Sequence, residues 1–597
     1  MTPARSSSAA PVEPEVLPGE IKSDEPDART LTGAVGDGVA LVAAVFALFH
    51  IYTAAPFVGS FPDLIQRSVH LSFAFVLCFL LYPAWPGRSS ARRPTVLDAA
   101  LAVAALVALV YIIRHYDWIM ENPSDSTRTG VILGTVLTVL TLEAARRTIG
   151  LIFTALGGIA IAYAYLGASI PGAWGHRGFG WVTIQESLYL STQGILGNVT
   201  GISATLVAVF LVFGAILYHT GGGETFVDLA KLIAGRSHGG PAKVSVFSSA
   251  FFGTISGSAV ANVVVDGIFN IPLMKRMKYK AEFAAAVEAT ASSGGQIMPP
   301  VMGAGAFIMA ELLQISYTQV AIAAALPALL YYLGCGAAIH FEARRLGLGT
   351  IPRELIPRAR DVFAWRRSAA LFIPVILLTY FLLQGYTAQT STFWSIIASL
   401  IIFVLSGSSL ADCRARLLSL GRALEAGGKG IVLVATLIAA AGIVIGMINL
   451  TGVGVKLSEF IIGTAGGSFL GALFLAMVVC LILGMGLPTT AAYVLAASVV
   501  APALIKLGAL PLAAHLFVFY FAIISAITPP VCAAVYVAAA IARADWVKTA
   551  LIATRLGLAG FIAPYMFIYA PALLWQGPLV EIAWVTVTAC VGVIALA

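Results

Sequence analysis

Charged residues are scarce in this chain. Asp, Glu, Lys and Arg make up 11% of its 597 residues, whereas a typical soluble domain carries about 25%. Hydrophobic residues make up 59%, and many apolar runs reach the roughly 20 residues that a membrane-spanning helix needs. This composition excludes a soluble globular protein and predicts an all-α polytopic membrane protein.

Cysteines and catalytic motifs are sparse as well. The six cysteines are scattered in mostly apolar segments and show no metal or redox spacing, so we interpret them as small buried side chains. The sequence has no HExxH, no GxxxxGK[ST], and no GxSxG with a membrane-embedded partner. These absences argue against an intramembrane enzyme and an ATP-driven pump, so we expect no enzymatic activity and no cofactor. The net charge of +7 comes from short basic loops, which does not indicate a nucleic-acid partner.

Residues 1–36 differ from the rest of the chain. They contain Pro, Ser and six acidic residues between positions 13 and 27, with few large apolar side chains. Such a segment cannot bury enough apolar surface to fold, and it lacks the apolar stretch of a signal peptide. We therefore expect a disordered tail.

The apolar runs predict about 14 spanning helices. We expect them near 37–57, 66–84, 97–114, 128–145, 149–167, 202–219, 282–311, 317–341, 368–386, 391–408, 430–450, 512–541, 549–573 and 578–597. With a cytoplasmic N-terminus, the inside loops hold most of the Lys and Arg, including the run 344–367. The positive-inside rule favours this orientation.

The segment 244–274 fits no full span. Lys243 precedes it and Lys275 follows it, so both ends lie on the cytoplasmic side. Its 31 residues are fewer than the roughly 40 that two spans need. We predict a re-entrant helical hairpin whose turn falls on Thr254–Asn262, a cluster of Gly, Ser and Asn.

A second hairpin is predicted by analogy at 467–506, with its turn at Gly484–Thr490. Length and charge alone also allow two full spans there. The two hairpins would open to opposite faces, which makes the repeat an inverted one. Each turn is followed about 40 residues later by a Pro-Pro break, at Pro299-Pro300 and Pro529-Pro530. Broken helices in two halves indicate a transporter's binding site at the middle of the bilayer.

The turns and breaks supply candidate ligands. Ser256, Gly257, Ser258 and Asn262 offer neutral oxygens, and proline frees carbonyls near Ser292–Gln296 and Ser525–Thr528. Each turn with its break would bind a hard cation such as Na⁺, and an anionic substrate would lie between the turns. The alternative is that Gly and Ser serve only close helix packing. For the substrate we expect contacts from both turns and both breaks, which are Ser258, Asn262, Gln296, Pro299, Pro300, Thr489, Thr490, Pro529 and Pro530.

Two acidic residues fall within the expected membrane region. Asp266 is on the second arm of the first hairpin, and Glu288 is on the first broken span. Ionisable groups at such depth are functional by default. We favour a bracing role, because both are close in sequence to the basic loop 275–280, and proton coupling is the second interpretation. The basic segment 409–429 and the segment 451–464 are expected to be helices on the two membrane surfaces.

The runs Gly239–Val244, Gly253–Asn262 and Ala291–Ala304 resemble the large permease of tripartite ATP-independent periplasmic (TRAP) transporters. The resemblance covers roughly residues 37–590, and Leu142–Thr148 is similar to the small subunit, as in fused permeases of the TAXI branch. It implies a small-subunit-like domain at 37–200 and a large-subunit-like domain at 201–597. It also implies an elevator-type fold of the ion transporter superfamily in the bacterial inner membrane.

The resemblance further implies two sodium sites. The first would use Ser256, Gly257, Ser258 and Asn262 with Ser292, Ser293, Gly294 and Gly295. The second would use Gly484, Gly486, Thr489 and Thr490 with the segment from Ser525 to Thr528. A Na⁺ gradient would drive import of an organic acid delivered by a periplasmic TAXI-type binding protein.

Two features stay open at this point. A stand-alone ion-coupled anion carrier is the alternative function, although the extra N-terminal helices argue against it. The sequence does not identify the substrate, and dicarboxylates, amino acids and sugar acids are all open. We expect a monomer surrounded by membrane lipids, because the additional helices would cover surfaces that an elevator dimer uses.

Overall fold

The computed structural model describes residues 28–597 except 86–92, 123–124, 408 and 531. Most of the predicted tail 1–36 lies outside the described residues. Its end does not, because helix α1 begins at Gly33 and the Arg29 side chain is buried. Arg29 Nη2 lies 2.7 Å from Asp98 Oδ2, and this buried ion pair orders a segment that we expected to be disordered.

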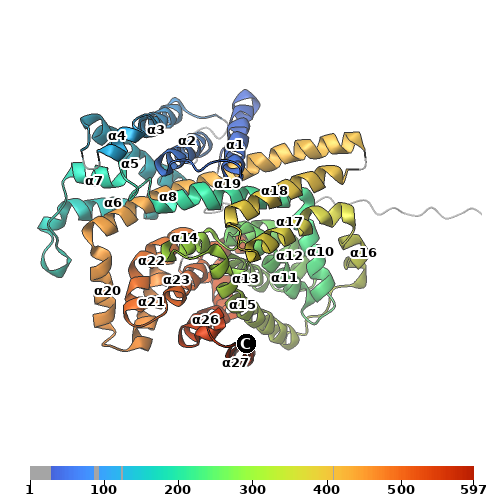
Figure 1. Cartoon of the computed structure of the whole chain (residues 1–597). Coiled ribbons are helices and arrows are strands. Elements are labelled where there is room, and N and C mark those ends of the chain that lie inside the picture. The colour runs from blue at the N-terminus through green and yellow to red at the C-terminus, as the bar shows by residue number, and fades with distance from the viewer. Residues whose placement is uncertain (1–27, 86–92, 123–124, 408, 531) are drawn as a thin grey trace, which may run out of the picture.

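Every element of the described chain is helical, and Figure 1 shows the helices gathered around the long helix α19. The N-terminal helices are α1 (Gly33–Thr53), α2 (Asp63–Leu81), α3 (Val96–Arg114), α4 (Tyr116–Glu121), α5 (Arg128–Thr148), α6 (Leu151–Leu166) and α7 (Trp181–Leu188). A bent stretch follows, with α8 (Asn198–Ile202), η3 (Ser203–Val207), α9 (Ala208–Leu217), η4 (Tyr218–Gly222) and α10 (Gly223–Ala234).

The remaining helices form the hairpins, the breaks and their surroundings. They are α11 (Gly240–Ser256), α12 (Ala259–Arg276), α13 (Ala281–Gly294), η5 (Gly295–Ile297), α14 (Ala304–Leu313), α15 (Tyr317–Arg345), α16 (Ala359–Val362), α17 (Trp365–Leu383), α18 (Ala388–Leu405), α19 (Leu410–Thr451), α20 (Val453–Thr464), α21 (Phe469–Gly484), α22 (Thr489–Lys506), α23 (Pro511–Ile524), η7 (Ser525–Ile527), α24 (Ala533–Ala542), α25 (Trp546–Leu556), α26 (Leu558–Tyr569) and α27 (Leu579–Leu596). Short 3₁₀ turns complete the set, namely η1 (Gly167–Ser169), η2 (Gly172–Trp174), η6 (Arg353–Leu355) and η8 (Pro571–Leu574).

Twelve helices of the described chain are long and apolar enough to span a membrane, against the 14 spans expected. The expected spans 282–311 and 512–541 are each divided by a Pro-Pro break, and the third difference is a shorter apolar helix, Ser368–Leu383. The hairpin arm α22 meets the length and hydropathy of a span. An all-α polytopic membrane fold is confirmed.

Helix α19 differs from the prediction. The basic segment 409–429 and the expected span 430–450 form one continuous helix of 42 residues, about 63 Å long at 1.5 Å per residue. The helix continues because residues 410–451 include no proline. It packs against α1, α2, α5 and α6 of the N-terminal part and against α9 and α22 of the rest. Figure 1 shows it crossing the molecule between these two groups.

A buried ion-pair network holds the N-terminal helices together. Thr95 caps α3 through a capping box with Asp98, which turns the Asp98 carboxylate inward. Asp98 Oδ1 accepts from Arg147 Nη1 at 2.6 Å, and Arg147 Nε donates to Glu143 Oε1 at 2.8 Å. Because removing one partner of a buried pair strands the other charge, this network fixes α5 against α3.

Candidate functional site

The first hairpin is formed by α11 and α12, which pack against each other. Only Gly257 and Ser258 separate the two helices, so the turn is shorter than the predicted Thr254–Asn262. Gly257 has φ of +63°, and a Cβ on it would lie 2.4 Å from the Met302 carbonyl oxygen. Glycine is therefore required both by the left-handed backbone and by this close approach. Ser258 is the N-cap of α12 and accepts from the Ala261 N–H at 3.3 Å.

The first break lies directly against this turn. A Cβ on Gly253 would lie 2.2 Å from Gly295 Cα, so α11 and the end of α13 touch backbone to backbone. The Ser256 hydroxyl donates to Asn262 Oδ1, and a Cβ on Gly295 would meet Asn262 Nδ2 at 2.5 Å. The structure thus brings Ser256, Gly257, Ser258, Asn262 and Gly295 together at one point.

Other residues of the predicted first site lie elsewhere. Ser292 Oγ donates to Glu288 Oε1 at 3.0 Å, and Ser293 Oγ donates to the Ala289 carbonyl at 2.9 Å. Gly294 faces the ring of Tyr331, which a Cβ would approach to 2.4 Å. These three residues belong to α13 and contact Glu288, Ala289 and Tyr331. None of these partners belongs to the hairpin turn.

The carbonyls near the first break are mostly paired. Tyr331 and Tyr332 donate their hydroxyls to the carbonyls of Thr290 and Ala291 at 2.8 and 3.1 Å. The Gln296 carbonyl accepts from the Gly303 N–H at 2.8 Å. Within the range Ser292–Gln296, where free carbonyls were expected, the Gln296 carbonyl is thus paired by the turn itself. The tyrosine hydroxyls from α15 pair the two carbonyls just before that range.

The second hairpin and its break show the same arrangement. Met485–Pro488 separate α21 from α22, and Gly486 has φ of +69°. Ser525 Oγ donates to the Gly484 carbonyl at 3.2 Å, which joins the turn to the break. Thr528 Oγ1 donates to the Ile524 carbonyl of its own helix end at 2.8 Å. Gly484 and Ser525 are thus in contact, and Thr528 turns away.

Both turns open onto one cavity of about 420 Å³. None of the residues that line it is charged. Its polar lining consists of Thr148, Ser256, Ser258, Gln296, Thr489, Thr490 and Tyr536. Of the predicted substrate contacts, Ser258, Gln296, Thr489 and Thr490 line the cavity, whereas Asn262, Pro299, Pro300, Pro529 and Pro530 do not. The prolines instead shape the breaks that place the neighbouring helices.

The first residues of four helices line this cavity. They are Ala259 of α12, Ala304 of α14, Thr489 of α22 and Ala533 of α24. A helix N-terminus presents unpaired N–H groups and a partial positive charge of about half an elementary charge. Four of them around one uncharged cavity favour an anion there.

Sequence reasoning missed the remaining walls of the cavity. Phe210 and Phe307, whose ring centroids are 4.6 Å apart, line it, as do Thr148 at the end of α5 and Val434 of α19. These residues come from four different helices, and no spacing along the chain showed that the four helices meet at one cavity. Tyr536 follows the Pro529-Pro530 break by six residues, and its hydroxyl donates to the Pro530 carbonyl at 3.0 Å. Its position beside the break is the signal that could have indicated it.

The donor set at each turn suits a monovalent cation. Na⁺ is bound in such settings by neutral hydroxyl, amide and backbone oxygens. The first turn supplies Ser256 Oγ and Asn262 Oδ1 in contact, and the second supplies the Gly484 carbonyl beside Ser525 Oγ. Both sets are free of basic residues, so the residues present fit the ion.

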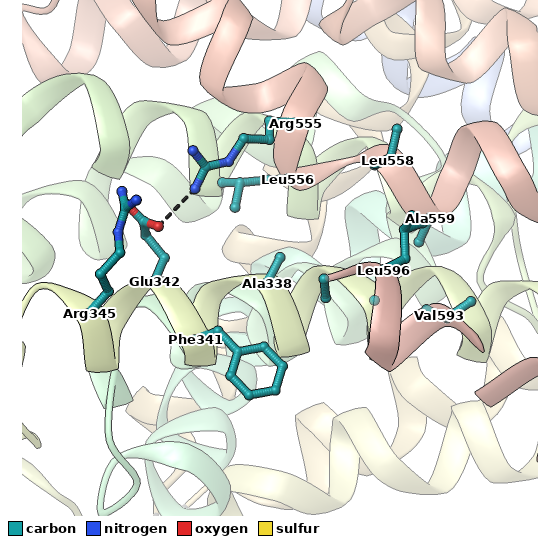
Figure 2. Close-up of a pocket in the computed structure, with 12 residues that line it drawn as sticks. Ala338, Phe341, Glu342, Arg345, Arg555, Leu556, Leu558, Ala559, Val593 and Leu596 are labelled. Atoms are coloured by element: carbon teal, nitrogen blue, oxygen red, sulfur yellow. Dashed lines mark hydrogen bonds and ion pairs between the residues drawn. The ribbon is translucent and has the colours of Figure 1, made fainter. Parts of the chain in front are cut away.

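A second cavity, of about 400 Å³, lies near the C-terminal end of α15 and beside α27 (Figure 2). Glu342 accepts there from Arg345 Nη2 at 2.5 Å and from Arg555 Nη2 at 2.8 Å. The two cavities share no lining residue. Because the three charged side chains already pair with one another, we assign this cavity no ligand.

Comparison with known proteins identifies the family. The family model described as "Tripartite ATP-independent periplasmic transporter, DctM component" matches residues 136–582. The match crosses residue 200, so the division of the chain into 37–200 and 201–597 stays a prediction.

Among curated relatives, a putative TRAP transporter large permease of Haemophilus influenzae is 27% identical over 35% of this chain and 50% of its own length. The isethionate TRAP transporter permease DctMQ of Oleidesulfovibrio alaskensis is 25% identical over 57% of this chain and 52% of its own length. The sialic acid TRAP transporter large permease SiaM of Vibrio cholerae is 25% identical over 33% and 45%. The chain thus spans about half the length of the curated relatives it matches.

Among solved structures, the YdaH transporter of Alcanivorax borkumensis has a TM-score of 0.45 and 16% identity, with 76% of this chain and 99% of that chain covered. The match to the family model extends over most of the membrane helices, from α5 to α27. The chain belongs to the DctM component family of tripartite ATP-independent periplasmic transporters.

Proposed function

We propose that this chain is the multi-pass inner-membrane permease of a sodium-coupled importer of a small organic acid. The observation that carries the proposal is the single cavity of about 420 Å³ at which both hairpin turns and four helix N-termini meet. In many secondary transporters the substrate site lies where the broken helices of two repeats meet. The arrangement of this cavity therefore supports a transport function.

The substrate would bind as an anion at the helix N-termini. Its acidic group would accept from the N–H groups at the starts of α12 and α22, with Ser258 and Thr489 beside them. Phe210 and Phe307 would contact its carbon skeleton. Related permeases are named for isethionate, sialic acid and C4-dicarboxylate, all of them organic acids, which supports this class of substrate.

Sodium ions would bind at the two turns and bring positive charge next to the substrate. The first ion would contact Ser256, Ser258 and Asn262, and the second would contact Gly484, Thr490 and Ser525. Because the cavity lining carries no Lys or Arg, a bound cation would increase the affinity for an anion by direct attraction. Substrate and Na⁺ would therefore bind cooperatively.

A soluble TAXI-type binding protein would deliver the substrate from the periplasm. One copy of the chain would form the transport unit, and its N-terminus would lie in the cytoplasm.

The elevator movement would carry the hairpins and breaks past α5, α9 and α19. This proposal is supported by the composition of the cavity wall, since Thr148 of α5 and Val434 of α19 line the same cavity as the two hairpin turns.

Sodium binding is tested on the purified chain in detergent. A ligand that binds only the folded state raises the melting temperature with its concentration. We expect NaCl to raise the melting temperature relative to choline chloride at equal ionic strength. An identical melting temperature in the two salts would contradict sodium binding.

Coupling and the binding protein are tested in proteoliposomes. Labelled dicarboxylates, sugar acids and amino acids would be screened with the TAXI-type proteins of the same genome. We expect uptake only when an inward Na⁺ gradient and a binding protein are both present. Uptake at full rate without any binding protein would identify a stand-alone ion-coupled carrier instead.

The elevator movement is tested by cross-linking two walls of the cavity. In a background without the six native cysteines, the pair Thr148→Cys and Val260→Cys would join α5 to α12. We expect a cross-link to stop uptake and a reductant to restore it. The control pair, Val260→Cys with Val537→Cys, joins two elements that would move together, so its cross-link should leave uptake intact. Equal uptake with both cross-links would argue against the movement.

A further inference from the structure

Two buried acidic side chains lie behind the first hairpin turn. Asp266 of α12 and Glu288 of α13 are both fully buried, and neither lines the substrate cavity. The bracing role expected from the sequence does not involve the basic loop, because both acids interact instead with serines of α11. No ion pair joins either acid to the basic loop 275–280, all of which the structure describes.

Serine hydroxyls donate to both carboxylates. Ser248 and Ser249 donate to Asp266 Oδ2 at 2.6 and 2.9 Å. Ser245 donates to Glu288 Oε2 at 2.7 Å, and Ser249 also lies 3.4 Å from Glu288 Oε1. One serine hydroxyl therefore connects the two acids, and α11, α12 and α13 meet in a single polar cluster.

Two oxygens in this cluster have no donor. Asn270 Nδ2 donates to Ser248 Oγ at 2.9 Å and to Glu288 Oε2 at 3.3 Å, yet Asn270 Oδ1 has no partner. Asp266 Oδ1 has none either. Asp266 and Asn270 are four residues apart on α12, so their side chains lie one above the other on the same face. Both unpaired atoms are acceptors, which a positive charge satisfies.

The surrounding helices do not supply that charge to the acids. Lys243 Nζ lies 3.0 Å from His340 Nδ1, Lys275 Nζ donates to the Ala542 carbonyl at 2.8 Å, and Arg555 pairs with Glu342. The other charged or titratable residues on the helices packed around the cluster are Glu224, Asp228, Lys231, Arg276, Glu282, Tyr317, Tyr331, Tyr332, Cys335, Arg344, Arg345, His515, Tyr520, Tyr536 and Lys548. Within the described chain, the hydrogen-bond partners of Asp266 and Glu288 are all Ser or Asn.

The second half of the molecule builds the same helices without this cluster. At the equivalent helix positions, Ala496 and Val500 of α22 replace Asp266 and Asn270, and Val518 of α23 replaces Glu288. All three are buried. Because apolar residues suffice for packing there, the acids of the first half serve another purpose. Burying two carboxylates without a positive charge is very unfavourable.

We propose that Asp266, Asn270 and Glu288 form a cation site separate from the hairpin turns. Its ligand is a single positive charge, either a hydrogen ion or an alkali metal ion, that contacts Asp266 Oδ1 and Asn270 Oδ1. The site spans α11, α12 and α13, so its cation moves with the first hairpin.

Infrared difference spectroscopy of the purified full-length chain tests for a hydrogen ion. A protonated carboxyl group gives a C=O stretch that a carboxylate lacks. Labelling the Asp or Glu carboxyls with ¹³C assigns this band to one residue type without any change in the sequence. We expect a labelled band that disappears in Glu288→Gln or Asp266→Asn. The control Glu342→Gln removes an acid with two arginine partners and should leave the band in place.

Thermal unfolding tests for an alkali metal ion. The double variant Ser258→Ala, Thr490→Ala weakens the proposed turn sites but leaves the acid cluster intact. If the cluster binds Na⁺, NaCl still raises the melting temperature of this variant, and Asp266→Asn added to it abolishes that rise. A carboxyl band supports a hydrogen ion as the occupant, and a residual sodium effect supports a metal ion. The absence of both in the folded, labelled chain overturns the site.

Discussion

The two halves of the transport region share a framework but differ in what they bury. In each half a hairpin is followed by a 14-residue helix, a three-residue 3₁₀ turn, a Pro-Pro pair and a ten-residue helix. The second arms, α12 and α22, each have 18 residues with a proline at the same position, Pro272 and Pro502. The framework thus depends on glycine and proline placement, whereas the buried acids belong to the first half.

The junction between turn and break also differs. In the first half Gly253 touches the backbone of Gly295, and in the second Gly484 touches the side chain of Ser525. A backbone contact cannot yield, whereas a serine side chain can rotate. The first junction is therefore the more rigid of the two, and the following experiments test the comparison.

The largest effect is expected from Gly253→Ala. Its Cβ would lie 2.2 Å from Gly295 Cα, so we expect a loss of about 3 kcal/mol or more in the free energy of unfolding, at the upper end for overpacking. Gly484→Ala meets Ser525 Oγ at 2.4 Å, which can rotate away, and Ser525 Cβ at 2.7 Å, which cannot, and it should cost about 2 kcal/mol. Denaturant unfolding of the purified variants measures both.

The control for this pair is Gly158→Ala on α6, where a Cβ would have nothing within 4 Å. It should leave the free energy of unfolding nearly unchanged. Ser525→Gly added to Gly484→Ala should recover the stability lost. Equal losses for Gly253→Ala and Gly484→Ala would show that the two junctions do not differ in rigidity.

Removing one hydroxyl from each turn compares the proposed sodium sites. Ser258→Ala and Thr490→Ala each remove an oxygen beside the cavity. A hydrogen bond or ligand to a charged group contributes roughly 1.5–3 kcal/mol, so we expect Na⁺ affinity to fall about tenfold or more in each variant, with the fold retained. Sodium titration of the melting temperature measures this change. Unchanged sodium dependence in both variants would contradict the assignment.

Exchanging the buried cluster for its apolar counterpart tests whether the acids stabilise the fold. The variant Asp266→Ala, Asn270→Val, Glu288→Val, Ser292→Ala carries the residues of the second half at the equivalent positions. Ser245→Ala and Ser249→Ala are added to it, because these two hydroxyls would otherwise lose their carboxylate acceptors. Replacing a complete buried polar group by apolar residues is often neutral or stabilising, so we expect a change below about 2 kcal/mol. A loss above this range would show that the cluster is a structural brace.

The smallest effect is expected at the ends of the second arms. Lys275 of α12 donates to the Ala542 carbonyl at the C-terminus of α24, where a cation is favoured by the helix dipole. Lys275→Ala should lower the free energy of unfolding by about 0.5–1 kcal/mol. Lys506 of α22 has no such contact among the described residues, so Lys506→Ala should change little. Equal losses of stability in Lys275→Ala and Lys506→Ala would contradict this difference between the ends of α12 and α22.

Much of the architecture was predictable from local patterns. Apolar runs marked the membrane helices, and the clusters at Gly257 and Gly486 marked both turns, because positive φ and close backbone approach require glycine. The Pro-Pro pairs marked both breaks for an equally local reason, since proline removes a backbone donor. The continuity of α19 was missed because its basic and apolar parts differ in composition and three glycines, Gly427, Gly428 and Gly430, lie at their junction.

The contents of the site were predictable only in part. Sequence spacing placed Ser256, Ser258 and Asn262 in one turn, since they are neighbours along the chain. It did not show that tyrosine hydroxyls from α15 satisfy the carbonyls beside the break. Those contacts join residues 41 positions apart and depend on how α13 and α15 are rotated against each other.

The sequence by itself determined where the chain enters, breaks and turns within the membrane, because hydropathy, glycine and proline act through the local backbone. Only the tertiary structure decided which oxygens remain unpaired, such as Asp266 Oδ1, and which helix ends meet at the cavity. Satisfaction of a buried polar group depends on partners from other helices, and no pattern along one segment specifies them.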